Sequence, residues 1–410
     1  MKEVRSGYKR TKVGVIPMEW AVKKLGEIGD SKIGLTYSPD DVVDSKGLLV
    51  LRSSNIRNGS LVYEDNVFVN KEVKEELLTK ENDILICARN GSKSLIGKNA
   101  LITSKAINLT FGAFMSIYRS EYNKFLFQMF QTELYKKQIS INLGATINQI
   151  TTKNLNDFIF PIPPIHEQEK IAEILSTWDS AIEKQEQLIE KKKEFKKGLM
   201  QNLYSKGTKK EMLVKSKLGE VPESWKIVKA KEVFKSVSIK NNENEELLSV
   251  TQDKGTIPKS QLEGNVVMPE GSTRGYKLVV PNNFIISLRS FQGGLEISKH
   301  RGIISPAYTV LDNKIEICHD YFKYYFKKEE FISRLNGAIV GIRDGKQISY
   351  ADFGEMFLPV PSLEEQIKIA EILMVADKEI ELLEKELEAL KLQKKGLMQR
   401  LLTGEVRVKV

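Results

Sequence analysis

The stretch Glu-Gln-Glu-Lys-Ile-Ala-Glu-Ile-Leu at residues 167–175 recurs as Glu-Gln-Ile-Lys-Ile-Ala-Glu-Ile-Leu at residues 365–373. Further along, Lys-Gly-Leu-Met-Gln at 197–201 recurs at 395–399 with the same offset of 198 residues. No insertion separates the matches, which is what a continuous helix requires. The 410-residue chain is therefore predicted to be one unit written twice, each copy ending in a long helix.

The sequence on the N-terminal side of each helix repeats less completely. A proline-rich lead-in, Pro161–Pro164, is matched by Pro359–Ser362. Between the matched landmarks the two copies diverge strongly, so the framework repeats and the material carried on it does not. The other landmarks are Gly-x-x-Pro-x-x-Trp at 14–20 and 219–225, the apolar run leading to an arginine at 83–89 and 283–289, and Gln-Ile at 149–150 and 347–348.

Two long helices are predicted where the repeat is most faithful. Residues 165–204 contain no proline and one glycine, Gly198, and prolines precede each helix, where they are tolerated. Apolar residues recur at seven-residue spacing in two interleaved rows, with Glu and Lys outside them, which is the pattern of a coiled-coil seam. The predicted seam comprises Ile171, Leu175, Trp178, Ile182, Ile189 and Leu199 in the first copy, and Ile369, Leu373, Ile380, Leu383, Leu387, Leu390 and Leu397 in the second.

Three arrangements of these helices satisfy the pattern. A helix of about 39 residues is about 58 Å long, too long to bury its stripe on one small domain. The favoured arrangement is an antiparallel pair whose register is set by the polar residues Gln185, Lys192, Lys196 and Lys394. The others are helices that dock separately on their own domains, and seams that join two chains in a dimer.

The segments between the landmarks are typical of a mixed α/β (α+β) fold, because short strands, turns and helices follow one another without regular βαβ alternation. The predicted organisation is a globular domain at 1–160, a helical segment at 161–207, a second globular domain at 208–358, and a second helical segment with a tail at 359–410. Strands are predicted at 48–51, 83–88, 113–118, 158–161, 284–288 and 307–311, helices at 125–139 and 320–335, and a turn at Asn58-Gly59.

The composition is that of a globular protein with a basic balance. Hydrophobic residues make up 41% of the chain, and 63 Lys and Arg exceed 54 Asp and Glu, for a formal charge of +9. This excess suits a polyanionic partner such as nucleic acid or an anionic membrane surface. Cys87 and Cys318 lie at apolar runs and are expected to be small core residues in a reducing compartment, although a disulfide between them is conceivable. No signal peptide or membrane span is visible, so a cytoplasmic location is expected.

The motifs of the common catalytic sites are absent from the sequence. His166, His300 and His319 do not have metal-ligand spacing, and no Cys/His cluster exists. Gly91–Lys98 resembles a phosphate-binding loop only superficially, because Asn99 follows the lysine and the glycine spacing is wrong. We therefore expect neither a catalytic site nor a metal site.

Several loops gather Arg, Lys, Asn, Gln and small hydroxyl residues, which favours DNA binding. Arg reads guanine edges, Asn and Gln read adenine edges, and Lys and hydroxyls hold phosphates. Ordinary polar loops would have a similar composition, but duplicated domains on a basic chain favour the DNA interpretation. The candidate contacts are Arg52, Asn55, Arg57, Arg89, Asn90, Ser92, Lys93, Thr146, Asn148 and Gln149 in the first copy, and Gln252, Lys254, Thr273, Arg274, Tyr276, Arg289, Gln292, Arg343, Lys346 and Gln347 in the second.

The run from Ile159 to Leu175 and its second copy from Leu358 to Leu373 resemble a family signature, that of the specificity (S) subunits of type I restriction–modification systems. The two Gly-x-x-Pro-x-x-Trp openings and the run Asp83–Ile86 before Arg89 are similar to that family too. The resemblance covers nearly the whole chain. Small departures are Ser362 in place of Pro164, and Glu364 in place of His166.

The resemblance implies two target recognition domains, each reading one half of a bipartite, asymmetric site in double-stranded DNA, with the paired helices as a fixed spacer. Members of the family have no catalysis of their own. They recruit two methyltransferase (M) subunits that use S-adenosylmethionine, and in the full complex restriction (R) subunits that use ATP and Mg. No cofactor is expected on this chain. The competing hypotheses are a coiled-coil scaffold whose globular units bind protein, and an enzyme with its own chemistry, which would need a cofactor motif.

Overall fold

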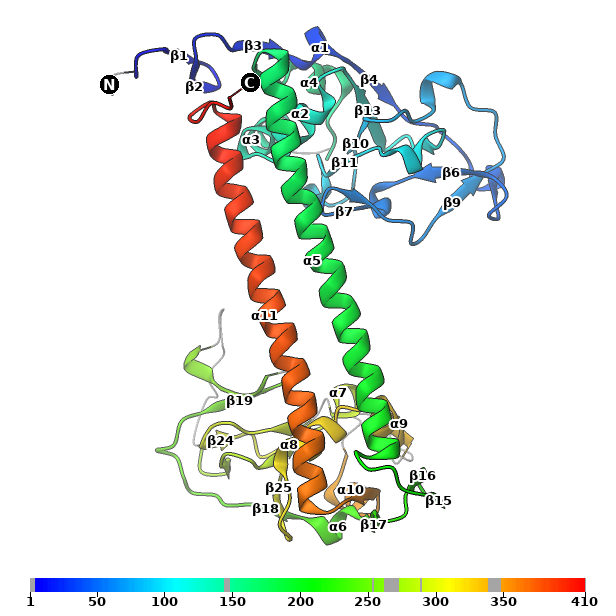
Figure 1. The fold of residues 1–410 in the computed structure, drawn as a ribbon, viewed down its shortest axis with the longest axis vertical. Helices are drawn as coiled ribbons and strands as arrows, with labels where there is room; N and C mark the ends of the chain where they lie inside the picture. Colours follow the sequence, from blue (N-terminus) through cyan, green and yellow to red (C-terminus); the bar gives the residue numbers. More distant parts are fainter. Residues whose placement is uncertain are drawn as a thin grey trace. The chain divides into compact units, whose positions relative to one another are not determined.

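The computed structural model describes residues 4–143, 148–252, 254–261, 273–287, 290–337 and 348–409. The chain forms two compact units, Met1–Glu186 with Glu386–Val410, and Gln187–Lys385. Each unit holds one globular domain and about half of each long helix, α5 (Ile165–Lys206) and α11 (Leu363–Leu402), which are labelled in Figure 1. In the part of the chain that the structure describes, no helix is long and apolar enough to cross a membrane.

The first unit is built on two four-stranded sheets. One is antiparallel, in the order β11 (Asn99–Leu101), β10 (Ile84–Cys87), β13 (Met115–Arg119) and β4 (Asp30–Ile33). The other has the order β12 (Thr110–Phe111), β6 (Leu48–Leu51), β9 (Val67–Val69) and β5 (Val42–Val43), and β12 joins β6 in parallel. The domain also has the strand pairs β1 (Tyr8–Thr11) with β2 (Gly14–Pro17), β3 (Ala21–Lys24) with β14 (Ile159–Ile162) and β7 (Ile56–Arg57) with β8 (Ser60–Leu61). Its short α-helices are α1 (Leu25–Ile28), α2 (Asn123–Met129), α3 (Glu133–Asn142) and α4 (Thr152–Asp157).

The second unit repeats part of this framework. Its central antiparallel sheet has the order β18 (Phe234–Val237), β25 (Thr309–Asn313), β22 (Phe284–Ile286) and β23 (Glu296–Ile297). The strand pairs are β15 (Leu213–Ser216) with β16 (Gly219–Pro222), β17 (Lys226–Lys229) with β26 (Phe357–Val360), β19 (Leu248–Thr251) with β20 (Gly255–Pro258), and β21 (Lys277–Val279) with β24 (Gly302–Ile304). The helices are α6 (Ala230–Val233), α7 (Ser290–Gly293), α8 (His319–Tyr325), α9 (Glu329–Gly337) and α10 (Tyr350–Gly354).

The turn before the central strand shows how faithfully the framework repeats. Asn82 and Asn282 adopt left-handed backbone conformations, with φ of 68° and 75°, which asparagine tolerates better than most residues. The side chain of the next residue accepts a hydrogen bond from a backbone N–H three residues earlier. Asp83 accepts from Lys80 at 2.7 Å, and Asn283 accepts from Val280 at 3.0 Å. The same local geometry therefore starts β10 in the first unit and β22 in the second.

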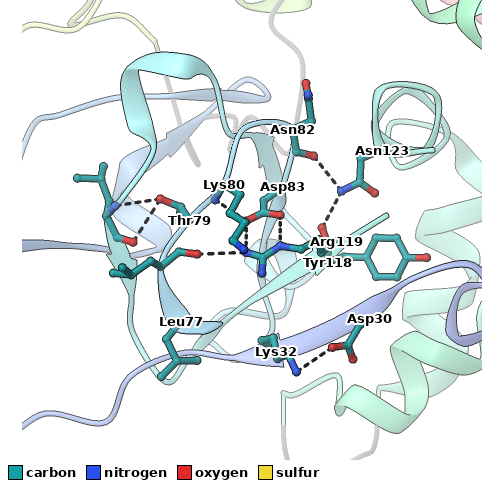
Figure 2. Close-up of polar contacts among 12 residues, drawn as sticks. Asp30, Lys32, Leu77, Thr79, Lys80, Asn82, Asp83, Tyr118, Arg119 and Asn123 are labelled. Atoms are coloured by element: carbon teal, nitrogen blue, oxygen red, sulfur yellow. Dashed lines mark hydrogen bonds and ion pairs between the residues drawn. The ribbon is translucent and has the colours of Figure 1, made fainter. Parts of the chain in front are cut away.

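Asp83 has a further role in the first unit, which Figure 2 shows. Its carboxylate is 1% exposed and receives two hydrogen bonds from Arg119, from Nε at 2.8 Å and Nη2 at 2.7 Å. Arg119 also donates to the carbonyl of Leu78 at 3.1 Å, and Asn123 donates to the carbonyls of Asn82 and Tyr118 at 2.8 Å each. A buried carboxylate with a bidentate arginine partner is well compensated, so this network clamps one end of the β10–β13 pair.

The predicted strands are confirmed to within about two residues. The turn predicted at Asn58-Gly59 is confirmed as well. It joins β7 to β8 as a two-residue hairpin, and both residues have the positive φ that a type I′ turn needs. The single helices predicted at 125–139 and 320–335 are wrong, since each is two helices, α2 with α3 and α8 with α9. The first break lets Phe130 stack on Tyr135 in the core, at 4.5 Å between ring centroids.

Long-helix segments contact each other inside each unit. In the first unit, Lys394 pairs with Asp179, and Lys391 Nζ lies 2.9 Å from Glu186. The corresponding pairs in the second unit are Lys196 with Asp377 and Lys193 with Glu384, the latter at 2.7 Å. Residue numbers rise along one helix as they fall along the other, so the two segments run in opposite directions in each unit.

The ends of the long helices also belong to the globular cores. Ile171 and Leu175 of α5 and Leu401 and Leu402 of α11 are buried in the core of the first unit, together with Trp20. Ile369 and Leu373 are buried in the core of the second unit. Thus each long helix is buried in a globular core at both of its ends, since Leu203 and Tyr204 of α5 also belong to the core of the second unit. All thirteen predicted seam residues are buried or half-buried.

Candidate nucleic-acid interface

Three of the predicted DNA-contact loops meet in the first unit, although they are far apart in the sequence. They follow β6 (residues 52–57), follow β10 (residues 89–94) and precede α4 (residues 148–149), and we call them together the loop cluster. Asn90 Nδ2 donates to Ser53 Oγ at 3.2 Å, and Asn148 Nδ2 donates to the carbonyl of Gly91 at 2.9 Å. These bonds hold the three loops on one surface of the domain.

Backbone contacts fix the same arrangement. Arg89 and Gln149 form an antiparallel bridge, and the Asn90 N–H donates to the Asn148 carbonyl at 3.3 Å. Lys98 Nζ donates to the Ser53 carbonyl at 3.2 Å. Because the main chain itself is paired, the positions of the loops are set by the fold. The predicted contact Thr146 lies outside the described residues.

The candidate side chains after β6 are engaged in different ways. Arg52 pairs with Asp65 at 2.8 Å, and Arg57 makes a two-pronged pair with Glu64 at 2.7 and 3.2 Å. The Arg57–Glu64 pair is exposed on both sides, whereas the Arg52 side chain is only 32% exposed beside an exposed Asp65. An exposed pair contributes little stability, so a phosphate could replace the Glu64 carboxylate. Asn55 differs, because its buried amide bonds the backbone of Arg52 and Val62.

The candidates after β10 are more accessible. Arg89, Ser92 and Lys93 are exposed, and the Ser92 hydroxyl lies 2.8 Å from the hydroxyl of Ser94. The guanidinium of Arg89 lies over the ring of Phe114, at 5.1 Å from its centroid. Phe114 was not among the predicted contacts, because an aromatic residue at the start of a predicted strand indicates a core position. In the structure this ring is 58% exposed.

In the second unit the candidates fall into two groups. Lys327 Nζ donates to the carbonyls of Gln252 and Gly293 at 2.9 Å each, which joins the loop that carries Gln252 and Lys254 to α7, which carries Gln292. Thr273, Arg274 and Tyr276 lie on a separate turn, where Arg274 pairs with Glu243 at 2.9 Å. The candidates Arg289, Arg343, Lys346 and Gln347 lie outside the described residues.

Cys87 ends β10 just before the loop of residues 89–94, and its side chain is fully buried. Burial raises the pKa of the Cys87 thiol, which therefore stays protonated at neutral pH. Cys87 and Cys318 are both free. Over the described ranges, no group of three or more His, Cys, Asp or Glu side chains could hold a metal ion. The arrangement presents cations, amides and hydroxyls to a ligand, which is the chemistry of nucleic-acid recognition.

Comparison with known proteins identifies the class. The family model described as "Type I restriction modification DNA specificity domain" matches residues 17–191 and 222–392. The chain therefore belongs to this family and carries its domain twice. It is a DNA-sequence specificity subunit of a type I restriction–modification system, as the sequence resemblance predicts.

Individual relatives support the same family. The chain is 27% identical over 420 residues to the type I restriction enzyme MjaVIII specificity subunit of Methanocaldococcus jannaschii, with 96% of this chain and 94% of that protein covered. Two solved structures share the fold. A chain from work on assembly and conformational transition of the type I R-M system has a TM-score of 0.55 at 15% identity, covering 95% of this chain and 99% of that one. The S subunit from M. genitalium has a TM-score of 0.53 at 16% identity, covering 98% of each chain.

Proposed function

We propose that the two units each read one half of a bipartite, asymmetric DNA sequence. The observation that carries the proposal is the loop cluster, in which three separate polar loops of the first unit are pinned together by Asn90 and Asn148. The family domain occurs twice, on a repeated framework with divergent loops. Two different sets of loops on one framework suit two different half-sites. We assign recognition to residues 1–160 and 208–358, and the helical spacer to 161–207 and 359–410.

The two long helices act as the spacer in this proposal, forming one antiparallel coiled coil with pseudo-twofold symmetry. Its support is the pairing inside each unit: Lys196–Asp377 and Lys394–Asp179 are related by the 198-residue repeat offset at both partners. A 42-residue helix is about 63 Å long. Half-sites on one face of B-DNA are about 34 Å apart per helical turn, so a helix pair of this length can hold two recognition domains at a fixed separation.

The chemistry is assigned to partner subunits. We propose that the chain is non-catalytic, that it docks two methyltransferase (M) subunits carrying S-adenosylmethionine, and that restriction (R) subunits using ATP and Mg join the full complex. The support is family membership and the fold shared with a chain studied in complex assembly. The free thiols of Cys87 and Cys318 agree with action in the reducing cytoplasm.

Methylome sequencing of cells with and without this gene tests the proposal. We expect a bipartite modified motif that disappears on deletion and returns when the gene is restored. A deletion that removes no motif would overturn it. Binding of the chain with its M subunits to duplex DNA should also weaken steeply as salt rises, because phosphate contacts release counterions. A salt-independent interaction would instead favour a protein-binding scaffold.

A further inference from the structure

The geometry points to Phe114 as a positioning residue that holds the guanidinium of Arg89 for reading a guanine in the first half-site. This inference rests on the proposed function and adds a residue and a base to it. Arg89 is one of the candidate contacts, whereas nothing in the sequence pattern marks Phe114. A lone exposed apolar side chain is ordinary, so the argument depends on what this ring touches and where it lies.

The position of the pair is fixed by the sheet. β10 and β13 are antiparallel, with Ile84 opposite Tyr118 and Cys87 opposite Met115. The Asp83–Arg119 network closes one end of this strand pair, and Arg89 and Phe114 lie just past the other end. The Phe114 carbonyl accepts hydrogen bonds from the N–H groups of Ala88 and Arg89, at 3.0 and 2.9 Å. The two side chains therefore leave neighbouring, hydrogen-bonded backbone positions.

The guanidinium of Arg89 has a different kind of partner from those of the other arginines in the first unit's candidate loops. Arg52 and Arg57 face the carboxylates of Asp65 and Glu64. No carboxylate within the described ranges pairs with Arg89, and its guanidinium lies over the exposed ring of Phe114 instead. An aromatic face attracts the cation without occupying its in-plane N–H donors. Those donors remain available for a base edge.

The chemistry of that edge follows from the donors. A guanidinium presents parallel N–H groups that match O6 and N7 of guanine in the major groove, and no other base offers two acceptors there. Stacking on a ring fixes the plane of the guanidinium and so reduces the entropy lost when both bonds form. Neighbouring Ser92 and Lys93 are exposed and suited to the adjacent phosphate. Arg89 would thus specify a base, and Phe114 would set its orientation.

Substitutions at both positions test the inference in the complex with its M subunits. Phe114→Leu keeps an apolar side chain but removes the aromatic face, and Phe114→Tyr keeps that face. Arg89→Lys keeps the charge but cannot form the planar bidentate contact. We expect Phe114→Leu and Arg89→Lys to relax discrimination about ten- to a hundredfold at one guanine of the first half-site, while Phe114→Tyr retains it. The measurement is the methylated fraction of each variant motif in the methylome.

A base analogue gives a second readout. In vitro methylation of duplexes with 7-deazaguanine at that position, which lacks the N7 acceptor, should be impaired for the wild type and for Phe114→Tyr. The same base analogue should reduce methylation by the Arg89→Lys and Phe114→Leu variants little further. The second half-site is the internal control for folding, because its recognition should not change in any variant.

The outcomes separate the two proposals. A bipartite motif that survives both Phe114→Leu and Arg89→Lys unchanged would overturn this inference and leave the proposed function standing. Equal relaxation at both half-sites would overturn it as well, because the effect would then be a general loss of structure. If the wild type yields no bipartite motif, the proposed function fails and this inference fails with it.

Discussion

A buried carboxylate at the start of each long helix shows how single residues stabilise the two units differently. Glu167 is 3% exposed and accepts hydrogen bonds from the Trp20 indole at 3.0 Å and from Arg407 Nε at 2.6 Å. Its counterpart Glu365 accepts from the Trp225 indole at 3.3 Å and from the Thr208 N–H at 2.9 Å. Among the described residues, an arginine bonds this carboxylate in the first unit alone. The bonds to Glu167 and Glu19 raise the pKa of Arg407 further, so it is always charged.

Replacing Arg407 with Gln should lower the free energy of unfolding by about 2 kcal/mol. Removing one partner of a buried pair costs about 3–5 kcal/mol, and the partial exposure of Arg407 reduces that figure. Urea unfolding followed by tryptophan fluorescence measures it. The matched control is Arg400→Gln in the last turn of α11, whose partner Glu405 is exposed and 3.9 Å away, with an expected effect below about 0.5 kcal/mol. Equal losses of stability in the two variants would contradict the role of Arg407 as the partner of the buried Glu167 carboxylate.

His319 predicts how acid affects the second unit. Burial lowers the pKa of this imidazole below 6.5, although Asp320 and Asp312 oppose the shift. The folded state then binds the proton less tightly than the unfolded chain, so this contribution to stability is complete above about pH 6.5 and is lost as the pH falls through the folded-state pKa. Between pH 7 and pH 5 the wild type should lose more stability than His319→Gln in urea titrations. The control is His166→Gln, a substitution at an exposed position. If His319→Gln loses as much stability as the wild type over this pH range, His319 is excluded as the cause.

The sequence predicts which chemical groups the interface residues carry, but it predicts less well what surrounds each of them in the fold. Arg89, Asn90 and Asn148 could be named as polar loop residues, but their convergence depends on long-range pairing of main chains that no local pattern encodes. Asn55 has the same local features, yet its amide is consumed inside the fold. Phe114 could not be found, because an apolar residue beside a strand indicates the core whether or not the fold covers it.

Among the secondary-structure elements, the long helices are the ones most completely specified by local sequence. The predicted span of 165–204 compares with 165–206 in the structure, since a seven-residue apolar repeat extends over many turns even though Gln185 and Lys192 interrupt one of its rows. The shorter helices are different. The break between α2 and α3 serves the packing of Phe130 against Tyr135, and tertiary packing of that kind overrides local helix propensity.

The contact between α5 and α11 in the first unit can be tested by charge reversal. Lys394 is 12% exposed and Asp179 is 40% exposed, so their coupling should be about 1 kcal/mol. Lys394→Asp should destabilise the chain, and adding Asp179→Lys should restore most of the loss in a double-mutant cycle. The exposed pair Lys385–Glu381 within α11 is the control, with an expected coupling of about 0.3–0.5 kcal/mol. Failure of the second substitution to restore stability would argue against direct pairing of these residues.

At the scale of the whole molecule, specificity should map to the divergent segments alone. Replacing residues 21–149 with the corresponding segment of a relative should change one half of the modified motif and leave the other half and the spacer length intact. The repeated lead-ins and helices are retained in such a chimera, so its assembly with M subunits should be unaffected. Methylome sequencing gives the result, and a change in both half-sites would contradict the assignment of one half-site to each unit.

The division of the chain has a consequence for the order in which it folds during synthesis. The second unit is continuous, Gln187–Lys385, whereas the first needs Glu386–Val410 to complete its core with Leu401 and Leu402. The part of the chain that the ribosome makes first is thus the last to be finished. Domains that are complete fold as they emerge. Nascent chains stalled at the point where residue 385 has just left the exit tunnel should therefore resist proteolysis in the second unit, while the first unit is still cleaved. Protection of the first unit should appear only when the final residues are released.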